Sequence, residues 1–191
     1  MTEMNQVESA VREILLAIGE DPDREGLRAT PERVRRMYGE IFGGYAMDLE
    51  TVVHGAVFNE TSGGMVVVRD ISFYSMCEHH MLPFFGTVDA AYIPDGRVIG
   101  LSKIPRIVEM YARRLQIQER MTRQISDALE TILAPKGVAI RVRGSHMCSM
   151  MRGVKKESAT LLTTRYTGVF ESDPETRNEF YRQLGMTEDA E

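Results

Sequence analysis

The stretch that decides the fold runs from Val66 to Ile93 and reads VVVRDISFYSMCEHHMLPFFGTVDAAYI. Its two halves, Val66 to Met76 and Phe84 to Ile93, are rich in β-branched and aromatic residues, which is the composition of strands. The second half ends in Pro94-Asp95-Gly96, a sequence typical of a turn. The stretch therefore predicts two successive strands, with the polar segment Cys77-Glu78-His79-His80 between them.

Helical patterns follow these strands. Apolar residues recur at helical spacing from Ile104 to Leu115 and again from Met121 to Leu133. Two further strand-like runs cover residues 138–148 and 158–170, and a short helix over 174–184 closes the chain. The order strand, strand, helix, helix, strand, strand predicts an α+β fold with one four-stranded sheet and two helices on one of its faces.

The segment before the sheet reads as helical. Apolar residues from Val7 to Ile18 recur at helical spacing, and Gly19 is a natural stop. Thr30-Pro31 predicts the start of a second helix, with the threonine as its cap and the proline in its first turn. We expect this helix to end near Gly43. The predicted organisation is a helical appendage over residues 1–60 and a catalytic domain over 61–191.

Composition limits the function classes. The chain has 191 residues with 43% hydrophobic content, which is enough for a substantial core. A net charge of -5 argues against general nucleic-acid binding, which uses a basic surface. No apolar run approaches the roughly 20 residues that span a bilayer. The amino terminus, MTEMNQVESA, lacks the pattern of a secretory signal. We therefore expect a cytoplasmic protein that binds neither nucleic acid nor membrane.

The predicted sheet has a face and edges that the chain does not obviously cover. Two helices occupy one face, and only the small amino-terminal helices remain for the rest. Exposed sheet edges favour pairing with other chains. We therefore expect several copies of the chain to associate.

The side chains that bind soft metals are concentrated in two short stretches. Both cysteines and three of the four histidines fall in Cys77-Glu78-His79-His80 and His146-Met147-Cys148. Cys77 and His80 are three residues apart, so a thiolate and an imidazole from one turn can reach the same ion. A thiolate and a neutral ring nitrogen suit zinc. The two stretches together predict a metal site.

Strand parity suggests how the second stretch joins this site. If the strand that begins at Val138 continues to Cys148, His146 and Cys148 leave the same face of the sheet. Cys148 would then complete a trio with Cys77 and His80. Three protein ligands leave zinc a fourth position for water, which is typical of catalytic rather than structural sites. The pattern therefore favours hydrolysis.

Two other interpretations of these residues stay open at this point. The two cysteines could form a disulfide, although no secretory signal supports an oxidising compartment. The cysteines and histidines could also be ordinary core residues.

Longer motifs identify a family. The chain closely resembles GTP cyclohydrolase I, and the resemblance covers nearly everything from Thr30 to Leu184. It implies the tunnelling fold, with an antiparallel four-stranded sheet, and a homodecamer of two stacked pentamers. It also implies conversion of GTP and water to 7,8-dihydroneopterin triphosphate and formate, the first step of tetrahydrofolate and pterin synthesis. The motifs that carry it are TPERV (30–34), SMCEHHMLPFFG (75–86), AYIPDGRVIGLSKIPRIVEMYARRLQIQERMTRQI (91–125) and SHMCSMMRGV (145–154).

The resemblance divides the residues of the two short stretches between two tasks. Cys77, His80 and Cys148 match the zinc ligands of the family. His79 and His146 match its acid and base residues, and a histidine titrates near neutrality, as this work requires. The resemblance adds a third catalytic residue, because Ser102 in GLSK matches the serine that assists the later ribose rearrangement.

The resemblance also supplies a substrate pocket, shared between neighbouring subunits. Glu119 would accept hydrogen bonds from guanine, with Gln118 beside it. From the helical pattern alone, a solvated glutamate is the more ordinary interpretation of Glu119. The chain has no GxxxxGK[ST] loop, so side-chain cations must bind the triphosphate. The matching positions are Lys103, Arg106 and Arg152, with Arg33 and Arg36 as additions; Arg36 departs from the lysine usual there.

Three other classes of protein are compared with this prediction. A zinc nucleobase deaminase needs His-x-Glu and a later Pro-Cys-x-x-Cys, and this chain has neither. A nitrile reductase of the same fold would use a lone cysteine and a nicotinamide cofactor, which the paired motifs argue against. A binding module with a closed structural zinc would need a fourth protein ligand. The remaining histidine, His54, lies in no matching motif and is a poor candidate for that ligand.

Overall fold

The structure is a computed structural model that describes residues 3–61 and 63–186. Its internal contacts divide the chain into two compact units, Met1–Gly43 and Gly44–Glu191. The boundary that the sequence predicts, between residues 60 and 61, remains a prediction. No helix in the described part of the chain is both long and apolar enough to cross a membrane.

The first unit is a pair of packed helices, α1 (Glu3–Ala17) and α2 (Thr30–Ile41). Gly19 follows α1 with a φ of 87°, a left-handed conformation that glycine adopts without strain. Pro31 lies in the first turn of α2, as predicted. The prediction that Thr30 caps α2 is wrong. The helix already includes Thr30, the capping position is Ala29, and no side chain caps the helix there.

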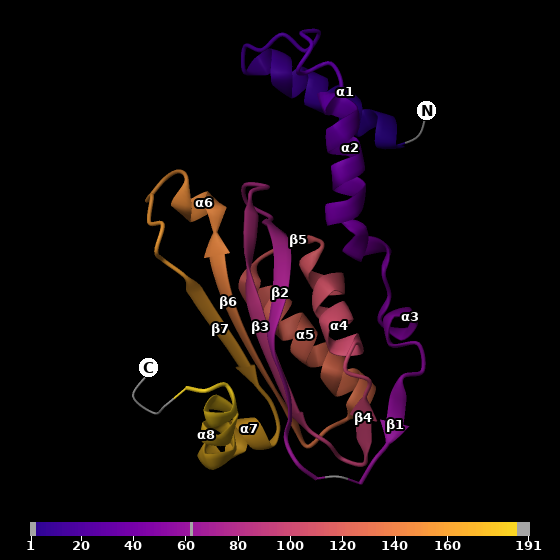
Figure 1. Cartoon of the computed structure of the whole chain (residues 1–191), viewed down its shortest axis with the longest axis vertical. Helices are drawn as coiled ribbons and strands as arrows, with labels where there is room; N and C mark the ends of the chain where they lie inside the picture. The colour runs from indigo at the N-terminus through magenta and orange to yellow at the C-terminus, as the bar shows by residue number, and fades with distance from the viewer. Residues whose placement is uncertain (1–2, 62, 187–191) are drawn as a thin grey trace. The chain divides into compact units, whose positions relative to one another are not determined.

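The second unit is built on a mixed sheet (Figure 1). Its strands lie in the order β5-β2-β3-β6-β7, antiparallel throughout except for the parallel pair β2 and β5. The prediction of four antiparallel strands therefore lacks β5. Helix α4 ends at Ala112, and the chain then extends so that Leu115 pairs with Met76. The strands are β2 (Val66–Cys77), β3 (Pro83–Ile93), β5 (Leu115–Gln116), β6 (Gly137–His146) and β7 (Leu161–Tyr166).

Two short strands form a second, smaller sheet. They are β1 (Val57–Asn59) and β4 (Arg97–Ile99), which pair in antiparallel register. The 3-10 helix Gly43–Ala46 and the helix α3 (Leu49–Val53) precede β1. The segment from Gly44 to residue 60 therefore packs with the sheet unit.

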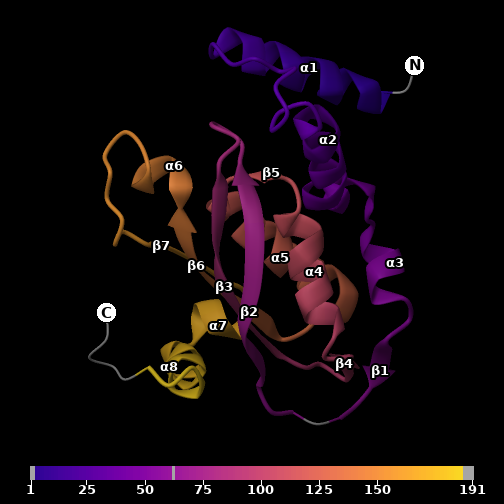
Figure 2. The same cartoon turned by 45° about the horizontal axis from the view of Figure 1, so that its top comes forward.

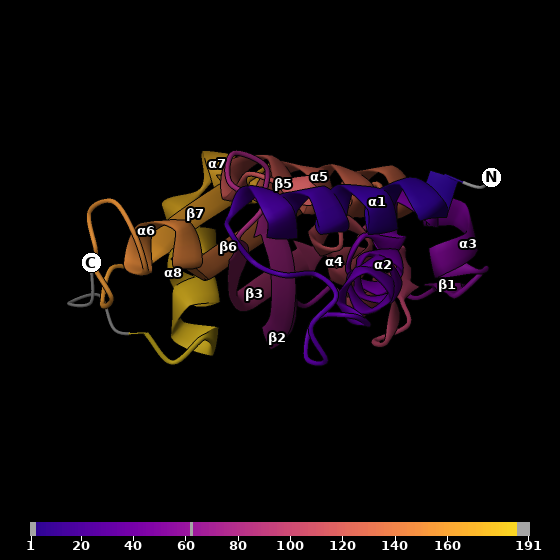
Figure 3. The same ribbon diagram turned by 90° about the horizontal axis from the view of Figure 1, so that it is seen from above.

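Helices α4 (Lys103–Ala112) and α5 (Gln118–Leu133) cover one face of the main sheet. Figure 3, seen from above, shows both helices on the side of the strands away from α8. Between them and the sheet lies the larger apolar core, in which Phe84, Val142, Ile107 and Leu129 are wholly buried. Removing the apolar surface of these side chains from water is the main contribution to the stability of the fold.

The carboxyl-terminal segment covers part of the other face. Phe170 and Phe180 pack against Ala91 and Ala139 in a second apolar cluster. The predicted strand over 158–170 is shorter in the structure, because β7 ends at Tyr166 and Gly168 turns the chain. A Cβ on Gly168 would lie 2.1 Å from the carbonyl oxygen of Lys136, so this close approach requires glycine. The helices after the turn are α7 (Val169–Ser172) and α8 (Pro174–Gln183).

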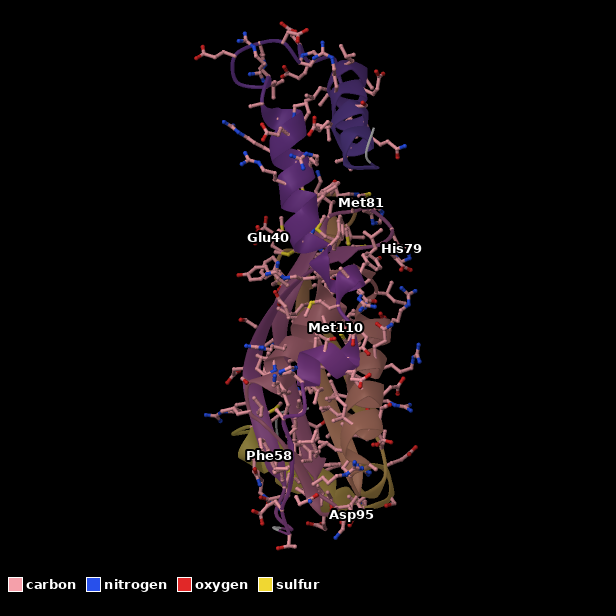
Figure 4. The ribbon with its side chains drawn as sticks, turned by 90° about the vertical axis from the view of Figure 1, so that its right-hand side faces the viewer. Glu40, Phe58, His79, Met81, Asp95 and Met110 are labelled. Carbon is pink, nitrogen blue, oxygen red and sulfur yellow. The ribbon has the colours of Figure 1, made fainter. Side chains whose placement is uncertain are left out.

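The two ends of the main sheet carry different loops. We call the end where β2 finishes at Cys77 and β6 finishes at His146 the motif end, and the end where β3 finishes at Ile93 the opposite end. Figure 2 shows β2 and β3 rising side by side to their shared turn, near β5 and α6. In Figure 4, His79 and Met81 lie at the motif end and Asp95 at the opposite end, with Met110 between them.

Candidate active site

Three metal-binding side chains meet at the motif end. One donor atom from each of Cys77, His80 and Cys148 lies within 4.8 Å of the other two. The Sγ atom of Cys77 is 3.9 Å from Nδ1 of His80. Both cysteines are free, so the structure does not contain the disulfide that the sequence left open.

The donor set fits zinc. Bonds of about 2.3 Å to sulfur and about 2.0 Å to nitrogen place the donor atoms of a tetrahedral site roughly 3.5 to 3.8 Å apart. The distance of 3.9 Å between Cys77 and His80 is close to this range. Two thiols and one imidazole are also the donors that zinc prefers over magnesium or calcium. A carboxylate is absent from the trio, so no hard cation is favoured.

The turn that carries Cys77 and His80 is fixed by its own backbone. The N–H of Met81 donates to the carbonyl oxygen of Cys77 at 2.8 Å, and the N–H of Cys77 donates to that of Leu82 at 2.9 Å. Met81 has a φ of 51°, a left-handed conformation that costs free energy for a side chain of this kind. Such strain persists only where the surrounding structure enforces it, as it does around this tight turn.

An ion pair ties the same turn to helix α5. The guanidinium of Arg120 contacts both carboxylate oxygens of Glu78, at 2.5 and 3.1 Å. The N–H of Glu78 also donates to the carbonyl oxygen of Gln116 at 3.0 Å. Hydrogen bonding to Arg120 is the largest cause that lowers the pKa of Glu78. This carboxylate therefore stays charged and anchors the turn between Cys77 and His79.

Cys148 reaches the cluster by a different route from the one predicted. The prediction that strand parity brings it to the metal is wrong, because β6 ends at His146 and Cys148 lies in the short helix α6 (Met147–Met150). The helical turn carries the thiol back over the end of the sheet. Burial raises the pKa of Cys148, and the neighbouring Cys77 raises it further. A bound cation would reverse this preference for the thiol.

The adjacent histidines differ in their surroundings. Nδ1 of His79 lies 3.9 Å from Sγ of Cys77, the same distance as Nδ1 of His80. Only His80 also approaches Cys148, so only His80 belongs to the three-donor cluster. The side chain of His79 is 64% exposed, and its Nε2 lies 3.9 Å from the carboxylate of Glu78. The position of His79 leaves it beside the metal site and open to solvent.

His146 is held far more closely. Its ring stacks on Phe84 with centroids 4.6 Å apart and planes 5° apart, because the two residues are paired across β3 and β6. Nε2 of His146 lies 3.0 Å from Oε1 of Gln118. Burial lowers the pKa of His146, and the charge of Glu119 opposes that shift. Half-buried and stacked, His146 has one well-defined orientation.

Glu119 is exposed at the start of α5, next to the buried Gln118. It lines an open hollow of about 300 Å³ between α5 and β7, together with Thr163 and Arg165. The placement leaves the Glu119 carboxylate accessible to a ligand.

Ser102, Lys103 and Arg106 do not meet the metal cluster within one chain. Ser102 and Lys103 lie at the start of α4, whose last residue, Ala112, is near the motif end. A helix of ten residues is about 15 Å long, so its start lies toward the opposite end of the sheet. Lys103 donates to the carbonyl oxygen of Val52 at 3.2 Å, and Arg106 is exposed one turn further on.

Three further cations were predicted to bind phosphate. Arg152 is exposed in the turn after α6, and its charge acts to lower the pKa of Cys148. Arg33 and Arg36 lie on α2, in the other compact unit, where Arg36 pairs with Glu32 at 3.6 Å. Their roles remain predictions.

The sequence interpretation missed Arg120 and Glu78. Glu78 lay inside the CEHH motif without a role, and Arg120 directly follows Glu119. Their pairing spans 42 residues of sequence. No local pattern could have signalled that contact.

The fold and the site define a class: an α+β protein in which three side chains could hold a metal ion and two further histidines flank them, an arrangement typical of metal-dependent hydrolases. Comparison with known proteins identifies one family. The family model for GTP cyclohydrolase I matches residues 7–185. The chain belongs to the GTP cyclohydrolase I family.

Members of this family share about half of their residues with this chain over most of its length. A GTP cyclohydrolase 1 of Leptospira biflexa is 52% identical over 91% of this chain and 95% of its own length. A GTP cyclohydrolase 1 of Deinococcus radiodurans is 54% identical over 92% of this chain and 82% of its own length. Among solved structures, an archaeosine synthase QueF-Like is 17% identical, with a TM-score of 0.47 over 56% of this chain and 97% of its own. That structural likeness is too low to add to the argument. The close relatives show that the chain is an enzyme of the GTP cyclohydrolase I type.

Proposed function

We propose that the chain is a zinc-dependent enzyme of the tunnelling fold that converts GTP and water to 7,8-dihydroneopterin triphosphate and formate. The observation that carries the proposal is the meeting of Cys77, His80 and Cys148 within a chain that matches the family over residues 7–185. These three residues would hold the zinc. When bound, the ion supplies Lewis-acid activation of the attacking water molecule.

The two histidines beside the metal site are the proposed acid and base. Opening the imidazole ring of guanine requires protons at the ring nitrogens as their bonds to carbon 8 break. His146 is stacked and hydrogen-bonded, whereas His79 is exposed. A fixed group suits the proton transfer that needs strict geometry, and an exposed group suits exchange with solvent.

Glu119 is the proposed acceptor for the amino and ring N–H groups of guanine. Its carboxylate is exposed beside an open hollow, whereas the side chain of Gln118 is buried. A carboxylate can accept two such hydrogen bonds at once. Lys103, Arg106 and Arg152, with Arg33 and Arg36, are the proposed ligands of the triphosphate, and Ser102 is the proposed helper in the ribose rearrangement.

A complete site would need a neighbouring subunit. Within one chain, Ser102 and Lys103 lie about a helix length from the metal donors. The edge strand β7 is also exposed, with Leu162 54% accessible, and no strand in the described ranges pairs with its outer side. Such an edge invites another chain. Both observations support the proposed homodecamer of two pentamers, with active sites between subunits.

Release of formate from GTP tests the proposed function. The freshly purified protein is assayed with GTP, after its metal content has been measured. Formate should form at a rate that follows zinc content, disappear after chelation and return when zinc is restored. Formate release that persists after complete removal of zinc would contradict the proposed mechanism.

A further inference from the structure

The buried side chain of Gln118 contacts His146, one of the two proposed catalytic histidines. Gln118 is the first residue of α5 and is 1% exposed. Its Nε2 lies 3.1 Å from the carbonyl oxygen of Val142 and 3.0 Å from that of Leu161. Its Oε1 lies 3.0 Å from Nε2 of His146. The carboxamide therefore bridges β6, β7 and the histidine.

The carbonyl contacts determine which way round the carboxamide lies. A backbone carbonyl only accepts hydrogen bonds, so the atom facing Val142 and Leu161 must be the NH₂ group. The reversed amide would place its oxygen against two carbonyl oxygens in a buried site and leave both of those acceptors without their donor. The oxygen of Gln118 therefore faces His146.

A nearby pair of threonines agrees with this orientation. The hydroxyl of Thr122 donates to the backbone carbonyl of Gln118 at 2.8 Å, which uses its only hydrogen. The hydroxyl of Thr163, 2.7 Å away, must then donate to Thr122. Its lone pairs remain for Nε2 of Gln118, at 3.1 Å. Both hydroxyl hydrogens therefore have a fixed direction, and neither points at the NH₂ group of Gln118.

The position of the carboxamide is also enforced by packing. A Cβ on Gly144 would lie 2.2 Å from Oε1 of Gln118, so the glycine makes the room that the amide occupies. Phe84 stacks on the ring of His146 and restrains its rotation. The acceptor and the ring that faces it are both held in place.

We infer that Gln118 is a positioning residue that holds His146 as the Nε2–H tautomer and leaves Nδ1 as the nitrogen that exchanges protons with the substrate. An amide oxygen has no hydrogen, so His146 Nε2 must be the donor in this contact. The carboxamide has no donor left for a purine, because its NH₂ group already faces three acceptors. Its place next to Glu119 puts it beside the guanine pocket without requiring contact with guanine.

The catalytic part of this inference rests on the proposed function, but the tautomer can be measured without GTP. The zinc-loaded protein, labelled with ¹⁵N-histidine, gives side-chain nitrogen signals that distinguish a protonated from an unprotonated ring nitrogen. The signals of His146 are assigned by their loss in His146→Ala. We expect a protonated Nε2 and an unprotonated Nδ1 in the unaltered chain. A proton on Nδ1 alone would overturn the inference, whatever the enzyme assay gives.

Kinetics distinguishes positioning from purine binding. Gln118→Met keeps the length of the side chain and removes the acceptor, so kcat for formate release should fall about 10- to 100-fold, because the ring loses the partner that fixes both its tautomer and its orientation. KM for GTP should change by less than about threefold. A large rise in KM at unchanged kcat would assign Gln118 to substrate binding instead. Gln124→Met, the same change six residues along α5 at a residue that contacts Gln116, is the matched control and should retain normal kcat.

A double-mutant cycle tests whether Gln118 acts through His146. In the His146→Ala background, Gln118→Met should lower kcat by no more than about twofold further, because the group that it positions is gone. A full, independent loss in that background would overturn the inference.

Gly144→Ala displaces the carboxamide of Gln118 without altering Gln118 or His146, and it should reproduce the fall in kcat. If neither variant folds, the nitrogen spectrum of the unaltered chain still decides. If the unaltered chain releases no formate from GTP, the proposed function is refuted. The inference about the tautomer of His146 would still be decided by the nitrogen spectrum.

Discussion

The two ends of the main sheet contrast in how their functional groups are held. At the motif end, side chains from β2, the turn after it, β6 and α6 contact one another or partners that are themselves fixed. They are Cys77, His80, His146 and Cys148. At the opposite end, Ser102 has no side-chain capping bond, and Lys103 contacts a single carbonyl oxygen. The named side chains at the motif end are therefore held in place, whereas those at the opposite end are loosely held.

The difference supports the proposal that a complete site forms between two chains. The groups at the motif end contact one another, whereas Lys103 and Arg106 form no ion pair with another residue in the described part of the chain. Under the proposed function, a substrate with a purine and a triphosphate would use both sets of groups where two chains meet. Each end is therefore best tested separately, with the other end as its control.

The largest effect is expected at the metal site. Cys148→Ser replaces a thiolate donor by a weaker hydroxyl, so zinc and activity should be lost together. The loss of kcat should exceed about 10³-fold, because the water would no longer be activated. Metal analysis and formate release on the same preparation check this. A variant that retains full zinc and no activity would mean that Cys148 is not a ligand.

His146→Ala should separate proton transfer from metal binding. The ring contacts Phe84 and Gln118 and lies outside the three-donor cluster, so most of the zinc should remain. We expect kcat to fall about 10²- to 10⁴-fold, the usual contribution of a positioned acid or base. The measurements are zinc content and single-turnover formate release. An empty metal site in this variant would show that the division between ligands and proton carriers is wrong.

Mixed oligomers test the idea that the two ends complete each other across chains. Cys148→Ser disables the motif end, and the double change Lys103→Ala with Arg106→Ala disables the opposite end, so each should be inactive alone. Coexpressed in equal amounts, they should recover up to about a quarter of normal activity, because some interfaces then pair two intact ends. Two Cys148→Ser copies carrying different tags are the control. No recovery in verified mixed oligomers would place the whole site within one chain.

Much of the motif end could be predicted from the sequence, because its signals are local. Cys77 and His80 share one turn, and the composition of β2 and β3 placed that turn between two strands. Cys148 was matched to the right cluster for a wrong reason, since the short helix α6 follows β6 where a continuing strand was expected. The hydrogen bonds of Gln118 depend on residues 24 to 45 positions away, and no periodicity records such contacts. The strand β5 was missed because two residues carry too little pattern to separate them from the preceding helix.

The smallest effect is expected where the motif end is tied to α5. Arg120→Ala removes the two-point contact with Glu78 and frees the turn that carries Cys77 and His80. The metal donors remain, so zinc should still bind, with affinity reduced about 10-fold, as for other residues that orient metal ligands. Competition with a chelator measures that affinity. Arg123→Ala is the matched control, because Arg123 lies one turn along the same helix and pairs with Asp127 at 3.2 Å on the surface. If both variants release zinc equally, the turn is held by its own backbone hydrogen bonds, and the ion pair adds nothing to the contrast between the two ends.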